Sequence, residues 1–462
     1  MTRGGPRVQR PRHARWRRAA PTPTLSLAAA TVWFALAYGG AILGYLGVNA
    51  FAARLLGDDF GYFVIAVSVS TVLGQLGLFG AHRGGMREAA RLRQDDEDGL
   101  LQLRLGVRVV SAVTLPLTAV LSAVATFFAI DADDRTRWSI AAGMGALVWF
   151  AGQQKLWANY LRGFGRTRFA SLLEGRSGGA LVAAAQGVLV GLVFLFVPGL
   201  GLPGALSAMA LGFPVPVFIA WRVVSRRWRH IPAGRISLKN VRAVIKQHRH
   251  FASNMLGGAF NSYMETWIAG LVLSGASVSL FSAAQRLSLL LTIATTSLGI
   301  VFSPVISRLF ERADRRRLEV LLRTGASMSA GLTAVLFVPM LVAPKPLLQA
   351  IYGASFGAAA PILVILTLGV ITNVLTGMCG VALMMSRYEA IVARVQWTGV
   401  AVRIGLGATL ALQFGSVGLA ASAAAVSACV SVTLWYLARR RLGMWTHLTL
   451  RPDCGLMRRT AG

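Results

Sequence analysis

The stretch that decides the fold runs from residue 251 to residue 307, FASNMLGGAFNSYMETWIAGLVLSGASVSLFSAAQRLSLLLTIATTSLGIVFSPVIS. It contains two apolar runs, Phe251–Ser274 and Val278–Ile306, which are joined by a Gly-Ala-Ser turn. Each run exceeds the ~20 residues that an α-helix needs to cross a bilayer core about 30 Å thick. The sequence therefore predicts a hairpin of two transmembrane helices.

One acid and one base lie inside this hairpin, Glu265 and Arg286. Glu265 lies ten residues before Gly275 and Arg286 lies eleven residues after it. At about 1.5 Å per residue, both are expected at a similar depth, roughly 15 Å below the turn. A charge at that depth costs about 2.5–3.5 kcal/mol and usually faces a partner or a watery cavity. Two interpretations are open: the two residues line a solute pathway, or they form a buried ion pair that only fixes packing.

Composition places the whole chain in a membrane. The 462 residues are 55% hydrophobic, with a mean hydropathy of +0.60. The formal net charge of +30 would suggest nucleic acid in a soluble protein. Here the basic residues cluster between apolar runs, where the positive-inside rule explains them, so no nucleic-acid partner is expected. No nucleotide loop, catalytic triad or metal-ligand spacing is found, so the sequence predicts neither an enzyme nor a bound cofactor or metal.

Ten further apolar runs flank the hairpin. The predicted fold class is therefore an all-α polytopic membrane protein with about 12 transmembrane helices in two six-helix lobes. The twelve expected spans are 25–53, 62–81, 105–130, 138–158, 170–197, 203–224, 251–274, 278–306, 324–343, 361–386, 389–413 and 417–438.

The charges of the connecting loops predict the orientation. Several Lys or Arg residues occur in the head of the chain, in 82–104, 159–168, 222–250 and 307–323, and in the tail from Arg439. The alternate loops carry almost none, namely Arg54, Arg135, Arg137 and Lys345. This asymmetry predicts a multi-pass plasma-membrane protein with both termini in the cytoplasm. Segments 82–104 and 307–323 are expected to form amphipathic cytoplasmic helices.

The spans divide six and six. The expected segments are a basic N-terminal tail (1–24), an N-lobe (25–224), a cytoplasmic linker (225–250), a C-lobe (251–438) and a basic C-terminal tail (439–462). Two glycine patterns repeat between the halves: Gly57 matches Gly275 at an offset of 218, and Gly201 matches Gly415 at an offset of 214. Such matches predict a parallel repeat about an axis normal to the membrane.

Other polar residues within or beside the spans are candidates for a substrate pathway. Arg403 lies deep in the eleventh span and is expected to face either a cavity or another helix. Glu174 and Arg176 precede a clean apolar run, which favours an ion pair at the cytoplasmic interface. Asn261 lies on the hairpin, where hydrogen bonding between helices explains it equally well. The candidate pathway residues are Glu265, Arg286, Arg403, Arg176, Glu174 and Asn261.

Four motifs resemble a known family. Leu280-Phe281-Ser-Ala-Ala284-Gln-Arg286-Leu287, followed by Ser303-Pro304, resembles the eighth helix of Wzx-like oligosaccharide flippases, the polysaccharide transporters of the multidrug/oligosaccharidyl-lipid/polysaccharide (MOP) superfamily. Residues 54–61, RLLGDDFG, resemble the family's first external loop. Residues 351–357, IYGASFG, and 414–420, FGSVGLA, resemble its ninth-to-tenth connection and the entry to its twelfth helix. The resemblance covers roughly residues 28–440.

The resemblance implies a V-shaped transporter of the MATE type that works by alternating access. It would carry a polyprenyl-pyrophosphate-linked oligosaccharide from the inner to the outer leaflet for cell-surface polysaccharide biosynthesis. Its partners would be the lipid-linked oligosaccharide, the bilayer, and a glycan polymerase or glycosyltransferases. By similarity, Glu265 occupies the acidic position of the seventh helix and Arg286 the basic position that follows. Gln75 departs from the family, because an acidic residue is frequent there.

Three other functions are considered. A drug antiporter of the same superfamily would favour deep acidic residues, whereas the deep charges here are mainly arginine. A membrane-bound glycan polymerase or ligase usually presents a long external loop, and every expected external loop here is short. A non-transporting scaffold for envelope assembly would keep its function when the deep charges are replaced.

Overall fold

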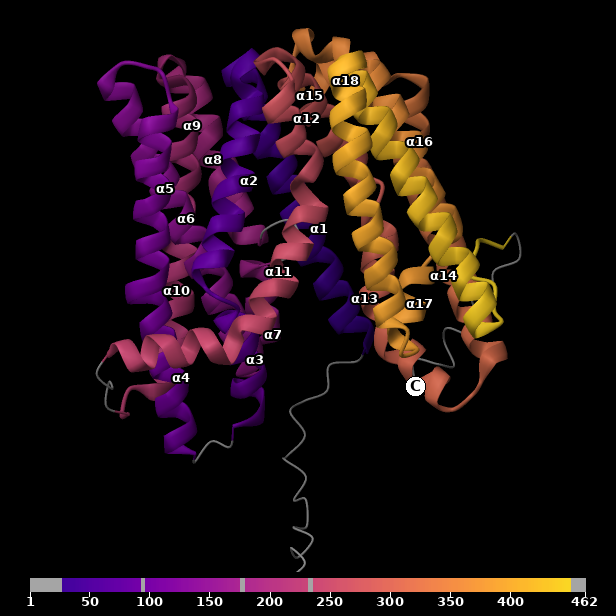
Figure 1. Cartoon of the computed structure of the whole chain (residues 1–462), viewed down its shortest axis with the longest axis horizontal. Coiled ribbons are helices and arrows are strands. Elements are labelled where there is room, and N and C mark those ends of the chain that lie inside the picture. The colour runs from indigo at the N-terminus through magenta and orange to yellow at the C-terminus, as the bar shows by residue number, and fades with distance from the viewer. Residues whose placement is uncertain (1–26, 93–95, 175–178, 232–235, 450–462) are drawn as a thin grey trace, which may run out of the picture.

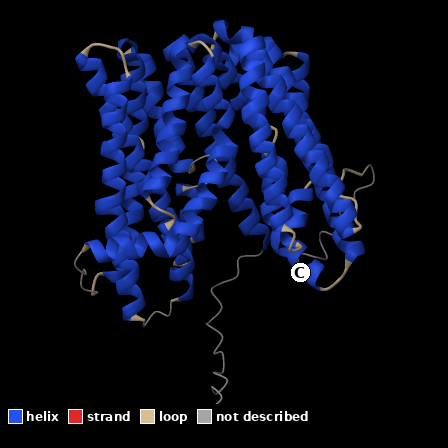
Figure 2. Cartoon of the chain, in the orientation of Figure 1, coloured by secondary structure: helices blue, strands red, loops and turns tan. Residues whose placement is uncertain are grey.

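The computed structural model describes residues 27–92, 96–174, 179–231 and 236–449. Throughout this part of the chain, helices are joined by short turns and no strand is present (Figure 2). The all-α fold predicted from the hydrophobic runs is therefore confirmed.

The helices of the first half of the chain have the following bounds. They are α1 (Leu27–Leu56), η1 (Gly57–Asp59), α2 (Phe60–Gly77), α3 (Ala81–Arg91), α4 (Glu97–Val109), η2 (Val110–Thr114), α5 (Leu115–Ala129), α6 (Asp134–Gly163), α7 (Thr167–Leu173), α8 (Ala180–Phe196), η3 (Pro198–Leu200), α9 (Gly201–Leu211), α10 (Pro214–Ser225) and η4 (Arg226–Trp228). The longest of them are α1 and α6, with 30 residues each, and α2, with 18.

The second half continues in the same manner. Its helices are α11 (Leu238–Val272), α12 (Gly275–Leu290), α13 (Ile293–Glu311), α14 (Arg315–Val342), α15 (Pro344–Tyr352), η5 (Ala354–Ala359), α16 (Ala360–Thr376), α17 (Cys379–Met385) and α18 (Glu389–Leu442). Within α18, Gly415 is non-helical, with φ of 61° and ψ of −144°, so α18 consists of two helices that meet at this residue.

Six stretches of the described chain are long and apolar enough to cross a membrane, or seven if the bent pair α12–α13 counts as one span. Two of the six, Gly39–Gly77 and Glu389–Leu442, each hold two passages, because the chain reverses at η1 and at Gly415. Outside these six stretches, α8 is also apolar but has only 17 residues. The helices that correspond to the twelve expected spans are α1, α2, α4–α5, α6, α8, α9–α10, α11, α12–α13, α14, α16 and the two halves of α18.

The passages form two bundles that approach each other at one end and diverge toward the other (Figure 1). Helices α1 to α10 pack mainly on one another, and α13, α14, α16, α17 and α18 do the same. The hairpin of α11 and α12 lies between them, since α12 contacts α2 and α16 while α11 contacts α2 and α18. Hereafter the "joined end" is the end with η1 and η5, and the "splayed end" is the end where α1 begins and α18 finishes.

The helix bounds differ in detail from several of the expected segments. The expected linker, 225–250, is helical from Leu238 onward, because α11 begins there with Ser237 as its cap. The expected amphipathic helix over 307–323 is instead the end of α13 and the start of α14, separated at residues 312–314. The helix expected over 82–104 is divided into α3 and α4, and α4 continues through a π-turn into α5.

Two expected single spans are broken. The span over 278–306 bends by 46° between α12 and α13. There the hydroxyl of Thr333 donates a hydrogen bond of 3.2 Å to the carbonyl of Leu291, which satisfies a polar group that the bend exposes. The span over 361–386 stops at Gly377, whose φ of +72° lies in the left-handed region that favours glycine.

The joined end is sealed by contacts between the two halves of the chain. The backbone N–H of Gly61 donates to Ser279 Oγ at 2.7 Å, and this hydroxyl donates to the carbonyl of Asp58 at 2.5 Å. Beside them, Phe60 packs against Tyr352 and Phe356 with ring centroids 6.1 and 5.9 Å apart. Such aromatic pairs contribute about 0.5–1.5 kcal/mol each beyond the area they bury. The bundles are thus held together mainly through this end.

Candidate functional site

The hairpin of α11 and α12 carries polar residues at the same depth but on different faces. Thr266 donates a hydrogen bond of 3.0 Å to Gln285, so these two residues face each other across the hairpin. Each residue of a helix is rotated by about 100° from the next. Glu265 and Arg286, which flank this contact, therefore point away from the shared face. The predicted similar depth is consistent with this contact, whereas no ion pair joins the two residues in the described part of the chain.

Glu265 instead pairs with Arg403 of α18. Its Oε1 lies 3.1 Å from the guanidinium Nη1, and the two side chains are 10% and 15% exposed. The pair joins α11 to the first half of α18, two helices that pack along each other. Arg403 was expected to face either a cavity or another helix, and this contact favours the contact with another helix. The attraction of the carboxylate offsets part of the free-energy cost of burying the guanidinium charge.

Arg286 points toward α1. Its guanidinium carbon lies 5.1 Å from the centre of the Tyr45 ring, which is an attractive cation–π arrangement. Its Nε is buried without a hydrogen-bond partner, and no carboxylate pairs with it among the described residues. Tyr45 belongs to the first bundle, so Arg286 lies where the two bundles face each other. A guanidinium without a counter-charge at this depth can receive an anion.

Glu174 is the centre of a second polar cluster, in the first bundle. Its carboxylate accepts bonds from Lys155 at 3.2 Å, Asn159 at 2.9 Å and Arg162 at 2.7 Å. These three residues occupy one face of α6 at spacings of four and three. The Glu174 side chain is only 11% exposed, so the cluster fixes α7 against α6. The expected partner Arg176 lies outside the described residues.

A pair of histidines lies near this cluster at the splayed end. His82, at the start of α3, is 3% exposed, and its Nδ1 has no hydrogen-bond partner in the described chain. Burial lowers its pKa to about 3, with smaller contributions from Lys155, Arg83 and His248. The ring of His82 is therefore neutral at physiological pH.

The comparisons with known proteins bear on this arrangement. The family model described as "Polysaccharide biosynthesis protein" matches residues 27–310. The chain belongs to this family. A second family model, described as "Lipid II flippase MurJ", matches residues 169–456. Together the two models cover both bundles, and they confirm the resemblance to the flippases of the MOP superfamily.

Among curated proteins, this family member is similar to a "Probable low-salt glycan biosynthesis flippase Agl15" from Haloferax volcanii. The two are 25% identical over 198 residues, which are 43% of this chain and 42% of that protein. The chain thus matches less than half the length of this curated relative.

Solved structures confirm the fold. The structure entitled "Lipid II flippase MurJ, inward closed conformation" matches with a TM-score of 0.69 at 12% identity, over 93% of this chain and 90% of that chain. An "Inward-facing conformation of a multidrug resistance MATE family transporter of the MOP superfamily" matches with a TM-score of 0.62 at 15% identity, over 89% and 94%. These identities show a shared fold alone.

Of the six candidate pathway residues, the structure brings together only Glu265 and Arg403. Arg286 and Glu174 lie in separate surroundings, and the side chain of Asn261 lies outside the described part of the structure. Sequence reasoning missed Tyr45 and the cluster on α6. A Lys, an Asn and an Arg at positions 155, 159 and 162 share one helical face, and this spacing could have indicated a site for a carboxylate. Among the described residues, no group of three or more potential metal ligands is found.

Proposed function

We propose that this protein is a flippase that moves a polyprenyl-pyrophosphate-linked oligosaccharide from the inner to the outer leaflet of the cytoplasmic membrane. Membership of the polysaccharide biosynthesis family supports this proposal. So does the physical problem that the substrate poses, because a glycan headgroup cannot cross hydrocarbon without polar partners. A protein with polar groups between two helix bundles supplies those partners.

The observation that carries the proposal is the uncompensated guanidinium of Arg286. It is held over Tyr45 between the bundles, while the other deep charges, Glu265 and Arg403, neutralise each other. The region between the bundles therefore keeps a net positive charge. A pyrophosphate would neutralise this charge and form short, charge-assisted hydrogen bonds. The planar guanidinium of arginine can bind two pyrophosphate oxygens at once.

The shape supports alternating access. The joined end is sealed through Ser279 and the aromatic residues around Phe60, whereas the bundles diverge toward the splayed end (Figure 1). Most basic loops lie at the splayed end, which the positive-inside rule assigns to the cytoplasm. The substrate would then enter from the cytoplasm. An inside-negative potential would favour outward passage of the anion by about 2.3 kcal/mol per charge per 100 mV.

Transport by purified protein tests the role of Arg286. Proteoliposomes are loaded with a fluorescent polyprenyl-pyrophosphate oligosaccharide, and its appearance in the opposite leaflet is measured with a membrane-impermeant quencher. Arg286→Leu should lose transport although the protein folds, and Arg286→Lys should be impaired because an ammonium cannot reproduce the bidentate fork. Arg394→Leu, at an exposed position of α18, is the matched control. Full transport by Arg286→Leu would refute the assignment.

The orientation has its own test. Reporter fusions after Pro232 and at the C-terminal end should both report the cytoplasm, and a fusion after Asp131 should report the outside. An external signal at either of the first two sites would place the splayed end outside, and the proposed direction of transport would be wrong.

Export of cationic drugs is an alternative function. The fold that this chain shares with a multidrug transporter of the superfamily supports it. The charges disfavour it, because the buried acid Glu265 is already paired with Arg403 and the free deep charge is positive. Exchange of a drug cation for protons or Na⁺ in the same proteoliposomes, unaffected by Arg286→Leu, would favour this alternative over the proposed flippase.

A further inference from the structure

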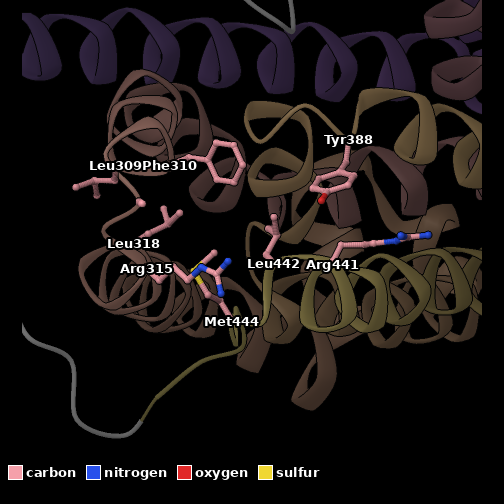
Figure 3. Close-up of a pocket in the computed structure, with 9 residues that line it drawn as sticks. Leu309, Phe310, Arg315, Leu318, Tyr388, Arg441, Leu442 and Met444 are labelled. Carbon is pink, nitrogen blue, oxygen red and sulfur yellow. The ribbon is translucent and has the colours of Figure 1, made fainter.

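A pocket of about 250 Å³ lies at the splayed end of the second bundle. It opens where the turn between α13 and α14 meets the start and the end of α18 (Figure 3). Arg286 is on α12, more than a full helix away along the chain from this end of α13. The pocket is therefore distinct from the proposed transport site, and an inference about it does not depend on that site.

The inner walls of the pocket are apolar. Leu309 and Phe310 come from α13, Leu318 from α14 and Leu442 from the end of α18. In Figure 3 the ring of Phe310 is directed toward Leu442 and Tyr388, whereas the side chain of Leu309 points the other way. Leu318 and Leu442 are almost completely buried, so the walls are fixed by packing in the second bundle. Such a lining favours hydrocarbon or a glycerol backbone over a fully polar ligand.

The rim of the pocket is positive. Arg315 and Arg441 line it from opposite sides, and none of its nine described lining residues is acidic. Nearby, Arg317 pairs with Asp314 at 3.3 Å. Arg315, by contrast, has no carboxylate partner in the described chain, and its guanidinium lies beside Gly443. An arginine without a carboxylate partner, placed above apolar walls, fits an amphiphilic ligand with an anionic headgroup and an apolar remainder.

The surroundings place the pocket at the level of lipid headgroups. Just after α18, Trp445 packs against Trp435 with ring centroids 5.3 Å apart, and Arg439 lies 4.3 Å above the Trp445 ring. Tryptophan and arginine gather where a helix leaves the hydrocarbon core for water. The rim arginines therefore lie near the phosphates of the adjacent leaflet.

We propose that this pocket binds an anionic glycerophospholipid, with its phosphate on Arg315 and its glycerol and upper acyl chains against Leu318 and Leu442. Basic pockets between transmembrane helices commonly hold such headgroups. Arg441 adds positive charge at the outer rim. The bound lipid would tie together the α13–α14 turn and the end of α18, which no ion pair joins in the part of the chain that the structure describes.

Ala313 offers a test that changes charge alone. It lines the pocket at the α13–α14 turn with a φ of +55°, a conformation that Asn and Asp adopt more readily than Ala. Ala313→Asn and Ala313→Asp should therefore both fold. They differ only in that the aspartate places a negative charge where the phosphate would lie.

Binding is measured by native mass spectrometry of the purified protein titrated with phosphatidylglycerol and, separately, with phosphatidylcholine. The unmodified protein and Ala313→Asn should prefer phosphatidylglycerol, and Ala313→Asp should lose this preference by roughly tenfold, the effect of about one charge-assisted contact. Equal preference in the Asn and Asp variants would overturn the proposal, as would equal binding of the two lipids by the unmodified protein.

A second matched pair addresses the arginine directly. Arg315→Gln should weaken phosphatidylglycerol binding, whereas Arg316→Gln, at the next and equally exposed position outside the lining, should not. Identical losses in both variants would mean that only diffuse positive charge attracts the lipid, and the pocket would then not be its site. Neither measurement involves transport, so failure here leaves the flippase proposal untouched.

Discussion

Replacing Arg403 with leucine should destabilise the protein by about 3–4 kcal/mol. Removing one member of a buried ion pair costs about 3–5 kcal/mol, because the other charge stays in a poor solvent. Here Glu265 would be left at 10% exposure on α11. Because both side chains keep a small exposed fraction, 10% for Glu265 and 15% for Arg403, the lower part of the range is expected.

The reasoning is tested by a double-mutant cycle with Glu265→Leu. If the two residues serve mainly each other, the variant that carries both leucines should be more stable than either single variant, because it leaves no charge buried. Thermal unfolding in detergent, followed by tryptophan fluorescence, gives the order of the four proteins. Additive losses in the double variant would refute the pairing.

Arg286→Leu is the internal comparison. Removing the Arg286 guanidinium leaves no carboxylate without a partner among the described residues. Only its contact with Tyr45 is lost, which is worth about 0.5–2 kcal/mol. We expect Arg286→Leu to unfold at nearly the same temperature as the unmodified protein and yet to fail in transport. The variant with leucine at both Glu265 and Arg403 should keep transport. A reversed pattern would move the substrate site to the Glu265–Arg403 pair.

Three smaller predictions concern the rest of the fold. Because the pKa of His82 is depressed, the unfolded chain takes up its proton first as pH falls, so stability is full above about pH 6.5 and declines toward pH 3, by at most about 1.4 kcal/mol per unit. His82→Gln should flatten this decline in unfolding measured between pH 7 and 5; an unchanged slope would contradict it. Gly61→Ala places a Cβ 2.7 Å from an α12 side chain and should increase hydrogen exchange at the start of α12, whereas Gly47→Ala, which meets nothing within 4 Å, should not. Thr446→Val removes a 2.9 Å bond to α16 and should cost about 1 kcal/mol in thermal unfolding. Gly377→Ala should cost more, because its φ is positive and its Cβ would meet the carbonyl of Thr446; a smaller loss would show that this C-terminal segment is not clamped there.

The depth of the buried charges could be predicted from sequence, and their partners could not. Counting residues from Gly275 puts Glu265 and Arg286 at the same level, and the contact of their neighbours in the hairpin agrees. The direction in which each side chain points depends on how α11 and α12 rotate about their own axes. That rotation is set by packing against α18 and α1, which are distant in sequence. Arg403 lies 138 residues after Glu265 and could not be chosen as its partner from spacing alone.

The breaks within spans were hidden for a related reason. The residues at Leu291 and Thr292 are ordinary helix formers, and the bend between α12 and α13 depends on a hydroxyl supplied by α14. Gly377 was a visible signal, but glycine is also frequent inside transmembrane helices, so its presence alone does not mark the end of one. Hydrophobicity therefore predicted the all-helical fold and the approximate places of its apolar segments, whereas tertiary hydrogen bonds determined where those segments bend.

The internal repeat, predicted from two glycine matches, gains support from backbone geometry. Gly201 and Gly415 have nearly the same conformation, with φ of 49° and 61° and ψ of −137° and −144°. Each begins the last passage of its bundle. In a molecule with two parallel repeats, equivalent residues meet only close to the symmetry axis. Gly61 and Ser279 are separated by 218 residues, the same offset as Gly57 and Gly275, and they are hydrogen-bonded at the joined end.

The axis relating the bundles would then pass through the contact between Gly61 and Ser279. Motion of one bundle against the other must open one end as it closes the other, and the bonds nearest the axis at the joined end are the ones that have to break. The hydroxyl of Ser279 both accepts from Gly61 and donates to Asp58, so its loss frees two backbone groups of the first bundle at once. If the protein works by the proposed alternating access, water or the proposed substrate must take over those two groups when the joined end opens.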